Sequence, residues 1–202
     1  IIVSGFSGAG KGTIMKELTT RYEQYALSIS ATTRDPRPGE EDGVAYFFKT
    51  KEQFEQMIAE GALIEHACYV NNYYGTPRAY VEAELAKGHD VILEIEIQGA
   101  LKVRRQFPDA LLLFVTPPSA EVLKNRLIGR GTETMDVIEH RLARALEEAE
   151  GLEEYDYLVV NDVLEEAVRE VHEIIQNEHY RVARNADKIR EMRNELKGFT
   201  RQ

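Results

Sequence analysis

The sequence predicts an α/β fold in which a parallel β-sheet core is flanked by helices. Apolar, β-branched runs of strand length alternate with helix-like runs along the 202 residues, as in folds of this class. The first apolar run leads directly into a glycine-rich turn and then a helix. With 43% hydrophobic and 30% charged residues, the chain can bury one sizeable core, so we expect one domain with appended segments.

The glycine-rich turn has the pattern of a phosphate-binding loop. A short apolar strand at residues 1–3 precedes residues 5–11, which fit G-x-x-x-x-G-K. Glycines let the backbone aim successive N–H groups at phosphate oxygens, and the following helix adds its N-terminal dipole. Lys11 supplies a full positive charge. The alternative is an ordinary turn with a solvated lysine, but strand, loop and helix follow in the order that the motif requires.

The residue after the lysine departs from this pattern. A Ser or Thr hydroxyl is expected there as a ligand for Mg²⁺, whereas this chain has Gly12 and places Thr13 one position later. Mg²⁺ is commonly held by substrate phosphates and water, so the departure does not exclude the metal. Thr13 is the nearest hydroxyl left to it.

Hydrophobic periodicity and glycine or proline breaks define the remaining elements. Strands are predicted at residues 1–3, 27–30, 46–48, 62–70, 90–97, 111–115 and 157–160. Helices are predicted at residues 13–22, 51–60, 78–87, 99–106, 120–128, 135–149 and 164–177. We expect a turn rich in hydrogen-bonding groups at residues 71–77, and beyond Glu178 a charged, solvent-facing helix that frays at its end.

Residues 31–43 form a polar loop with two arginines. The prolines at 36 and 38 stiffen this segment around Arg34 and Arg37. Two arginines on a stiff backbone can form a bidentate clamp for a phosphate with little loss of entropy. A solvated surface loop with incidental charge is an equally good interpretation of the composition.

Glu94 and Glu96 lie at the carboxyl end of the run DVILEIEI at residues 90–97. Parallel sheets bind ligands at the carboxyl ends of their strands, so these carboxylates suit a site better than a core. Their two-residue spacing predicts that both side chains lie on the same face. The alternative is a half-exposed strand, which the surrounding apolar residues disfavour.

The segment at residues 120–149 predicts a lid. Two helical runs flank a glycine- and arginine-rich turn at residues 129–133, and Arg141 and Arg144 lie on the second run. An arginine carried on a lid can neutralise a transferring phosphoryl group once water is excluded. The alternative is that such charged helices simply present a solvated face.

Composition limits the partners and the location of the protein. The formal net charge of −10 disfavours general nucleic-acid binding, and no apolar run is long enough to span a bilayer. The single cysteine, Cys68, excludes an intrachain disulfide framework and indicates a reducing compartment, hence a cytoplasmic protein. We expect Cys68 to be a packing residue. The five histidines are scattered without metal-ligand spacing.

Six stretches, in order, resemble the guanylate kinase family of the bacterial kind, and the resemblance runs from the first strand to about Asn177. They are SGAGKGT at 7–13, SATTRDPRPGEEDGVAYFF at 30–48, IEHA at 64–67, NYYGTP at 72–77, LEIEIQGA at 93–100 and RLIGRGTE at 126–133. A phosphate loop alone indicates only a nucleotide, whereas the six together are highly specific.

The resemblance implies a P-loop NTPase fold in a single domain. Its parallel-sheet core would comprise about 1–30, 88–118 and 150–178, with a small mixed α/β GMP-binding insertion at about 31–87. A helical lid would occupy about 119–149 and a helical tail about 179–202. The implied reaction is transfer of the γ-phosphoryl group of Mg-ATP to GMP or dGMP, with Mg²⁺ as the cofactor, within purine nucleotide metabolism.

The resemblance also assigns roles to residues by position. GMP-binding residues would be Ser30, Arg34, Arg37, Tyr46, Glu65, Tyr74, Thr76, Glu94 and Glu96. ATP-binding residues would be Ser7, Gly8, Ala9, Gly10, Lys11, Gly12, Thr13 and Asn161. Catalytic residues would be Lys11, Arg126, Arg130 and Arg141.

Guanine chemistry supports one of these assignments independently. Guanine presents N1–H and N2–H₂ as adjacent donors, and one carboxylate can accept from both, whereas adenine has no such pair on that edge. We choose Glu65 as this acceptor, with a hydroxyl of Ser30 or Thr76 as the donor to O6.

Phe6 stands where the family usually has proline, and Glu96 where it often has aspartate.

Two rival functions remain open from the sequence. One is a non-catalytic module that uses the arginine and tyrosine pocket to bind phosphorylated peptides, as guanylate-kinase-like domains of scaffold proteins do. The other is a kinase for a different phosphorylated acceptor. The sequence also leaves open whether the tail after Glu178 joins a second copy of the chain in a homo-oligomer.

Overall fold

Two β-sheets form the framework of the chain. The computed structural model describes residues 1–69, 71–129 and 134–199. The larger sheet has five parallel strands in the order β2–β7–β1–β8–β9. Its strands are β1 (Ile2–Gly5), β2 (Tyr25–Leu27), β7 (Asp90–Glu94), β8 (Leu112–Thr116) and β9 (Tyr157–Val160). This arrangement confirms the predicted α/β class with a parallel core.

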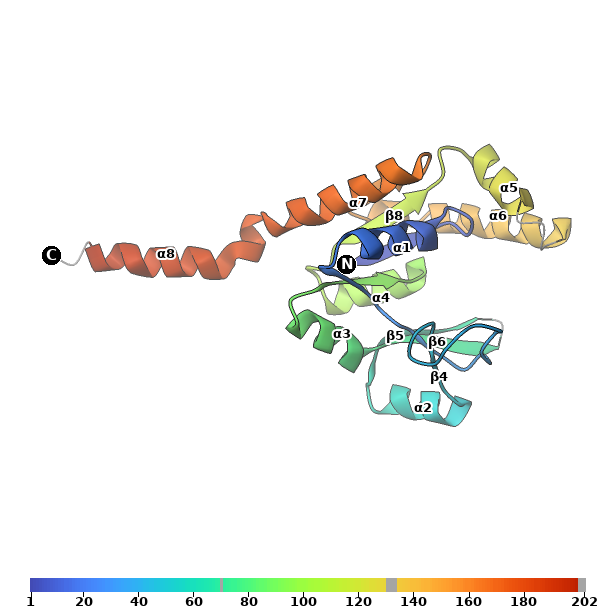
Figure 1. The fold of residues 1–202 in the computed structure, drawn as a ribbon, viewed down its shortest axis with the longest axis horizontal. Coiled ribbons are helices and arrows are strands. Elements are labelled where there is room, and N and C mark those ends of the chain that lie inside the picture. The colour runs from blue at the N-terminus through green and yellow to red at the C-terminus, as the bar shows by residue number, and fades with distance from the viewer. Residues whose placement is uncertain (70, 130–133, 200–202) are drawn as a thin grey trace.

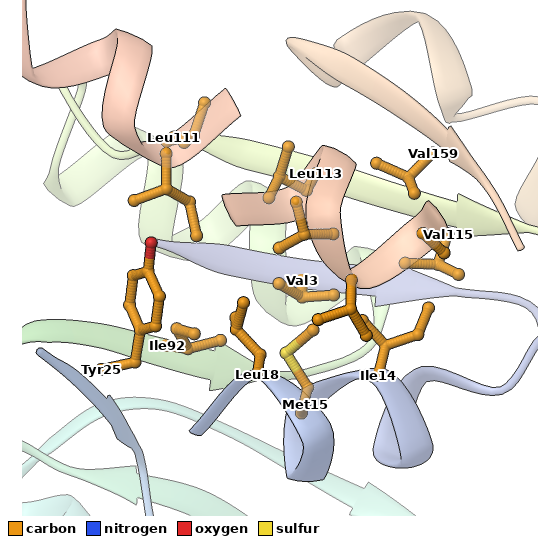
Figure 2. Packing of buried hydrophobic residues seen from close by; sticks show 14 of the residues in the cluster. Val3, Ile14, Met15, Leu18, Tyr25, Ile92, Leu111, Leu113, Val115 and Val159 are labelled. Atoms are coloured by element: carbon orange, nitrogen blue, oxygen red, sulfur yellow. The ribbon is translucent and has the colours of Figure 1, made fainter. Parts of the chain in front are cut away.

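Helices cover both faces of the larger sheet. Val3 packs on one face with α1 (Lys11–Arg21) and α7 (Leu164–His179), as Figure 2 shows for the residues around it. Its neighbour Ile2 packs on the other face, against the apolar residues of two further helices. These helices are α3 (Arg78–Ala86) and α4 (Ile97–Gln106). Alternation along each strand therefore divides the apolar residues between two cores.

A second, four-stranded sheet lies beside the first, with the order β4–β3–β6–β5 (Figure 1). Its strands are β3 (Ala31–Thr32), β4 (Phe47–Phe48), β5 (Leu63–Tyr69) and β6 (Asn72–Pro77). Helix α2 (Lys51–Ala59) begins at a capping box formed by Thr50 and Gln53. Phe54 of α2 is fully buried and stacks on Tyr73, with the ring centroids 5.2 Å apart.

The remaining helices lie at the two ends of the molecule (Figure 1). Helix α5 (Ala120–Gly129) packs on α6 (Met135–Ala149) through a small apolar cluster, to which Phe6 of the glycine loop adds its ring. The last part of the chain forms α8 (Ala186–Phe199), which confirms the predicted solvent-facing tail helix because it buries no side chain. Across the described ranges, no helix is both long enough and apolar enough to cross a membrane.

The segment at residues 71–77 is a strand, so the predicted turn there is wrong. Only Asn71, with φ of 61°, has the left-handed backbone of a tight turn. The residues after it form β6, which pairs antiparallel with β5 and β3. Its two adjacent tyrosines favour strand, and pairing on both sides outweighs the polar composition.

Four other expectations also need correction. The strand predicted at residues 27–30 lies at 25–27, as β2, and the first helix begins at Lys11 rather than Thr13. Cys68 is exposed rather than packed. β7 ends at Glu94, and Glu96 is the N-cap residue of α4, so strand alternation does not relate the two carboxylates.

Truncating Phe54 tests how much the core of the smaller sheet contributes to the stability of the fold. Phe54→Ala removes a side chain that is 0% exposed, and we expect a loss of about 3–5 kcal/mol in the free energy of unfolding. Leu85→Ala, at a residue that is 54% exposed, is the matched control and should change stability by about 0.5 kcal/mol or less. Urea denaturation measures both. A loss below about 1 kcal/mol for Phe54→Ala would contradict the packing described here.

Candidate active site

A cleft opens between the carboxyl edge of the larger sheet, the smaller sheet and α6. Its volume is about 450 Å³, within the ~300–1,000 Å³ typical of small-molecule sites. The polar and charged residues that line it are Ser7, Lys11, Ser30, Tyr46, Glu65, Tyr74, Glu94, Glu96, Gln98, Arg141, Arg144 and Glu148. Three separate parts of the chain therefore meet at one site.

The glycine loop forms one wall of this cleft. A Cβ atom at Gly5 would lie 2.2 Å from the carbonyl oxygen of Val115, so only glycine permits this approach of β1 to β8. Gly8 and Gly10 have φ of 96° and 91°, in the left-handed region that favours glycine. The Lys11 ammonium donates to the carbonyl oxygens of Gly5 (2.7 Å) and Phe6 (3.2 Å). Two carbonyl oxygens of the loop therefore hold the Lys11 ammonium against the loop.

Asn161 and Arg126 support the loop from behind. The side-chain amide of Asn161, 7% exposed, donates to the carbonyl oxygen of Ala9 at 2.8 Å. The Arg126 guanidinium donates to the same carbonyl oxygen at 3.4 Å and to the backbone oxygen of Asn161 at 2.8 Å. A Cβ at Gly10 would lie 2.4 Å from the Asn161 amide nitrogen. These contacts fix the backbone of the loop against the end of β9.

The opposite wall contains a buried carboxylate. Glu65 on β5 is 7% exposed, and its Oε1 accepts a 2.8 Å hydrogen bond from the hydroxyl of Thr76 on β6. Its Oε2 faces the start of α4, where a Cβ at Gly99 would approach it to 3.0 Å. Burial raises the pKa of the Glu65 carboxyl, and the Thr76 hydrogen bond opposes this shift. Thr76 therefore positions Glu65 and does not itself line the cleft.

Arg34 lies beside the two cleft tyrosines, and Glu40 holds it there. The guanidinium lies 5.3 Å from the ring centroid of Tyr46, and its Nη2 donates to both carboxylate oxygens of Glu40 at 2.9 Å. The rings of Tyr46 and Tyr74 are 6.2 Å apart. Burial raises the pKa of Tyr46 further above neutral pH, where a phenol is a hydrogen-bond donor in any case. Arg37 is exposed and does not line the cleft.

Glu94 lies at the floor of the cleft, between the two walls. A Cβ at Gly12 would be 3.9 Å from Glu94 Oε2, so the carboxylate reaches the start of α1. Part of Glu94 is open to solvent, yet the protein atoms around its carboxyl group raise its pKa, and the nearby Lys11 ammonium opposes this shift. Thr13 is exposed on α1 and does not line the cleft.

Helix α6 brings two arginines to the cleft. Arg141 donates a hydrogen bond to the hydroxyl of Ser7 in the glycine loop. Arg144 donates to Glu96 at 2.5 Å across the cleft and to Glu148, one turn along α6, at 3.2 Å. Arg144 and Glu148 were not selected as site residues from the sequence. Arg144 lies three residues after Arg141, and Glu148 lies four residues after Arg144. This spacing was the available signal, because it places all three on one side of the helix.

The structure brings most of the predicted site residues together. Those that line the cleft are Ser7, Lys11, Ser30, Tyr46, Glu65, Tyr74, Glu94, Glu96 and Arg141. Those that lie next to the lining residues or behind the loop, outside the cleft lining, are Gly8, Ala9, Gly10, Gly12, Thr13, Arg34, Thr76, Arg126 and Asn161. Arg37 is exposed and lies outside the cleft lining, and Arg130 falls outside the described residues.

The fold and the loop define a class of protein. A glycine loop between the first strand of a parallel sheet and the following helix, with a lysine at its exit, is the phosphate-binding arrangement of P-loop NTPases. A second sheet that supplies a polar pocket within the same cleft adds a place for another ligand beside the loop.

Comparison with known proteins identifies the family. The family model described as guanylate kinase matches residues 1–178. A guanylate kinase from Oceanobacillus iheyensis is 53% identical over 193 residues, which cover 94% of either chain. A guanylate kinase from Streptococcus mutans is 50% identical and covers 96% of this chain and 93% of its own. The crystal structure of guanylate kinase from Anaplasma phagocytophilum aligns with a TM-score of 0.73 at 32% identity, covering 91% of this chain and 88% of that one. The chain belongs to the guanylate kinase family, and its fold is the P-loop NTPase fold.

The raised pKa of Glu65 predicts a pH-dependent change in stability. A carboxyl group whose pKa is higher in the folded state costs stability as pH rises from its unfolded pKa to its folded pKa, and above the folded pKa the whole cost of burying the charge is present. Glu65→Gln keeps an acceptor for Thr76 but removes this charge. We expect the variant to unfold at a higher temperature than the wild type at pH 7, with a difference that narrows as the pH falls.

Thermal unfolding of both proteins between acidic and neutral pH measures this effect. Glu82→Gln, at an exposed residue of α3, is the control and should leave the wild-type curve unchanged. If Glu65→Gln were the less stable protein at neutral pH, the assigned environment of Glu65 would be wrong.

Proposed function

We propose that the chain transfers the γ-phosphoryl group of ATP to the phosphate of GMP, and of dGMP as a second acceptor, giving ADP and GDP or dGDP. One observation carries this proposal: the buried Glu65 carboxylate and the Lys11 loop line the same cleft from opposite walls. A carboxylate that can accept hydrogen bonds from guanine and a phosphate-binding loop in a single cleft suit a reaction between two nucleotides. The setting for such a reaction is purine nucleotide metabolism, and we propose a cytoplasmic location.

The smaller sheet, within residues 31–87, forms the acceptor site in this proposal. Ionised Glu65 accepts from N1–H and N2–H₂ of guanine, and the Ser30 hydroxyl donates to O6. The Thr76 hydroxyl donates its hydrogen bond to Glu65, which it holds in place, rather than to the base. The acceptor phosphate binds Tyr46, Tyr74 and the loop arginines Arg34 and Arg37. To bind it, Arg34 exchanges its contact with Glu40 for phosphate oxygens.

The donor triphosphate binds the glycine loop. Residues 7–13 direct their N–H groups to its phosphates, and the Lys11 ammonium exchanges the two loop carbonyl oxygens for phosphate oxygens. Asn161 shapes the loop and borders the adenine site. Segment 119–149 acts as the lid, from which Arg141 and Arg126 neutralise charge on the transferring group; Arg130 has the same proposed role.

Mg²⁺ suits the donor set as a ligand of the phosphates. Within residues 1–69, 71–129 and 134–199, no cluster of three His, Cys, Asp or Glu side chains could enclose a metal ion. Glu94 near Gly12 offers a carboxylate oxygen beside the loop, and Thr13 a hydroxyl one residue further along. Bound there, Mg²⁺ would neutralise charge on the β- and γ-phosphates.

The reaction needs no general base. The second ionisation of a phosphate monoester lies near pH ~6, so the attacking oxygen of GMP is already anionic at neutral pH. The work of the protein is to hold two anions in line while cations and N–H donors offset their repulsion. The absence of a histidine from the cleft lining is compatible with this chemistry.

A coupled assay of ADP release tests the proposal directly. With ATP present, GMP and dGMP should support turnover, whereas AMP and UMP should support little. Activity with another monophosphate instead of GMP would reassign the acceptor. No turnover with any of the four would favour a non-catalytic module that binds phosphorylated peptides.

Lys11→Met tests the donor side. We expect kcat to fall by about 10²-fold or more, because one positive group that stabilises charge in the transition state is lost. Lys16→Met removes the same charge from an exposed position of α1 and is the matched control. Circular dichroism checks that both variants are folded. Near-normal kcat in folded Lys11→Met would contradict the proposal.

Glu65→Gln tests the acceptor side. The loss of a charge-assisted pair of hydrogen bonds should weaken GMP in kcat/KM by about 1–3 kcal/mol, with little change for AMP. The same variant should be more stable than the wild type at neutral pH, so misfolding cannot explain the kinetic loss. An unchanged ratio of kcat/KM for GMP and AMP would remove Glu65 from base recognition.

A further inference from the structure

The ring of Phe6 lies between the core of the larger sheet and the helices α5 and α6. On one side it packs on the fully buried Phe114 of β8, with the ring centroids 4.9 Å apart and an angle of 77° between the ring planes. On the other side it packs against the apolar cluster that joins α5 to α6. An edge-to-face aromatic contact favours a defined geometry, so β8 determines where this ring lies. The ring therefore connects the two helices to a fixed point of the core.

The backbone of Phe6 belongs to the glycine loop. Its carbonyl oxygen accepts hydrogen bonds from the N–H of Ala9 at 3.0 Å and from the Lys11 ammonium at 3.2 Å. Ser7, the next residue, lines the cleft and accepts a hydrogen bond from Arg141 of α6. Phe6 itself does not line the cleft. Its backbone therefore contacts one cation of the site, while its ring packs on the helix that carries another.

Arg141 lies beside the apolar face of α6. It follows the buried Ile138 by three residues, and Ile138 belongs to the cluster against which the Phe6 ring packs. Residues three apart are neighbours on a helix, so a shift of α6 at this apolar contact also moves the Arg141 guanidinium relative to the loop. Gly8 adds a contact with α5, because a Cβ atom at Gly8 would lie 3.0 Å from Cδ2 of Leu127. The glycine loop therefore packs against both helices.

We propose that Phe6 is a positioning residue, whose ring holds α6 so that Arg141 lies at the phosphates bound by the glycine loop. This inference rests on the proposed phosphoryl transfer, in which Arg141 neutralises charge on the transferring group. Such a cation acts only within hydrogen-bond reach of the phosphoryl oxygens, and a misplacement of about 1 Å can cost roughly a hundredfold in rate. Phe6 therefore influences the reaction through Arg141 and not through its own contact with a substrate.

The apolar contact of Phe6 suits this role better than the polar contacts of α6. Arg141 exchanges the Ser7 hydroxyl for phosphate oxygens when the donor binds, and the exposed pair of Arg144 and Glu96 contributes little. The contact of the Phe6 ring needs no such exchange, and its separation from α6 would expose apolar surface to water. It is therefore the contact that orients α6 while the cations bind the substrates.

Replacement of the ring tests this role through kcat and KM. Phe6→Ala should lower kcat about tenfold or more and change the KM for GMP by less than about twofold, because Glu65 and the acceptor site lie on the opposite wall of the cleft. Phe6→Leu keeps an apolar side chain between β8 and the helices and should recover most of the lost kcat. Ile175→Ala is the control, because it truncates a side chain of α7 that is 1% exposed and lies outside the cleft lining. It should lower stability and leave kcat of the folded protein unchanged.

A double-mutant cycle with Arg141 tests whether Phe6 acts through that residue. In the Arg141→Ala background, Phe6→Ala should lower kcat by less than about twofold, because the cation that the ring positions is already absent. A distortion of the glycine loop would lower kcat in either background, because Lys11 is present in both. Full additivity of the two changes would therefore overturn the proposal.

Hydrogen exchange measures the packing of α6 without any turnover. The amides of α6 should exchange faster in Phe6→Ala than in the wild type, and close to the wild-type rate in Phe6→Leu. Unchanged exchange of α6 in folded Phe6→Ala, or a loss of kcat that Ile175→Ala shows equally, would overturn the role of Phe6. Normal turnover of both the wild type and Phe6→Ala would overturn this inference alone, whereas a wild type without GMP-dependent turnover would overturn the proposed function.

Discussion

The close approach of β1 to β8 at Gly5 is the constraint on which the nucleotide cleft depends. A single methyl group on Gly5 would lie 2.2 Å from the carbonyl oxygen of Val115 and would force the two strands apart. These strands are parallel neighbours in the centre of the larger sheet, so their spacing also fixes where the loop leaves it. Asn161 and Arg126 then anchor the loop at the carbonyl oxygen of Ala9. The core therefore fixes the conformation of the loop.

The charged side chains of the site are also held in place by neighbouring protein groups. Four cations near the cleft have protein partners: loop carbonyl oxygens for Lys11, Glu40 for Arg34, Ser7 for Arg141 and Glu96 for Arg144. Phosphates therefore exchange partners with these groups instead of ordering loose side chains, which lowers the entropic cost of binding. Glu65 and Glu94 are held differently, because their surroundings raise the pKa of each carboxyl group and so disfavour the charge.

The sequence predicted the core more accurately than the pocket. Repeating apolar runs gave β9 and α6 at their observed bounds, and the six matching stretches gave the family. Local composition failed where long-range pairing decides the structure, as for β6, which is polar yet bonded on both sides. It placed Arg144 on the lid but not its contact with Glu96, since that contact joins residues 48 positions apart and needs the fold to bring α6 to the start of α4. Cys68 was predicted as packing because the sequence does not show which side of β5 faces solvent.

The contacts of α6 suggest how the cleft can change shape without disturbing its walls. Arg144 and Glu96 have side chains 42% and 58% exposed, and an exposed ion pair contributes only about 0–1 kcal/mol. The hydrogen bond from Arg141 to Ser7 is another contact between α6 and the site. By contrast, the apolar contacts of α6 with α5 include the buried Ile138 and Leu127, and their separation would expose apolar surface. Because Arg126 on α5 also holds the glycine loop, α5 should stay with the core, and the weak Arg144–Glu96 pair is the contact of α6 that breaks and reforms most readily.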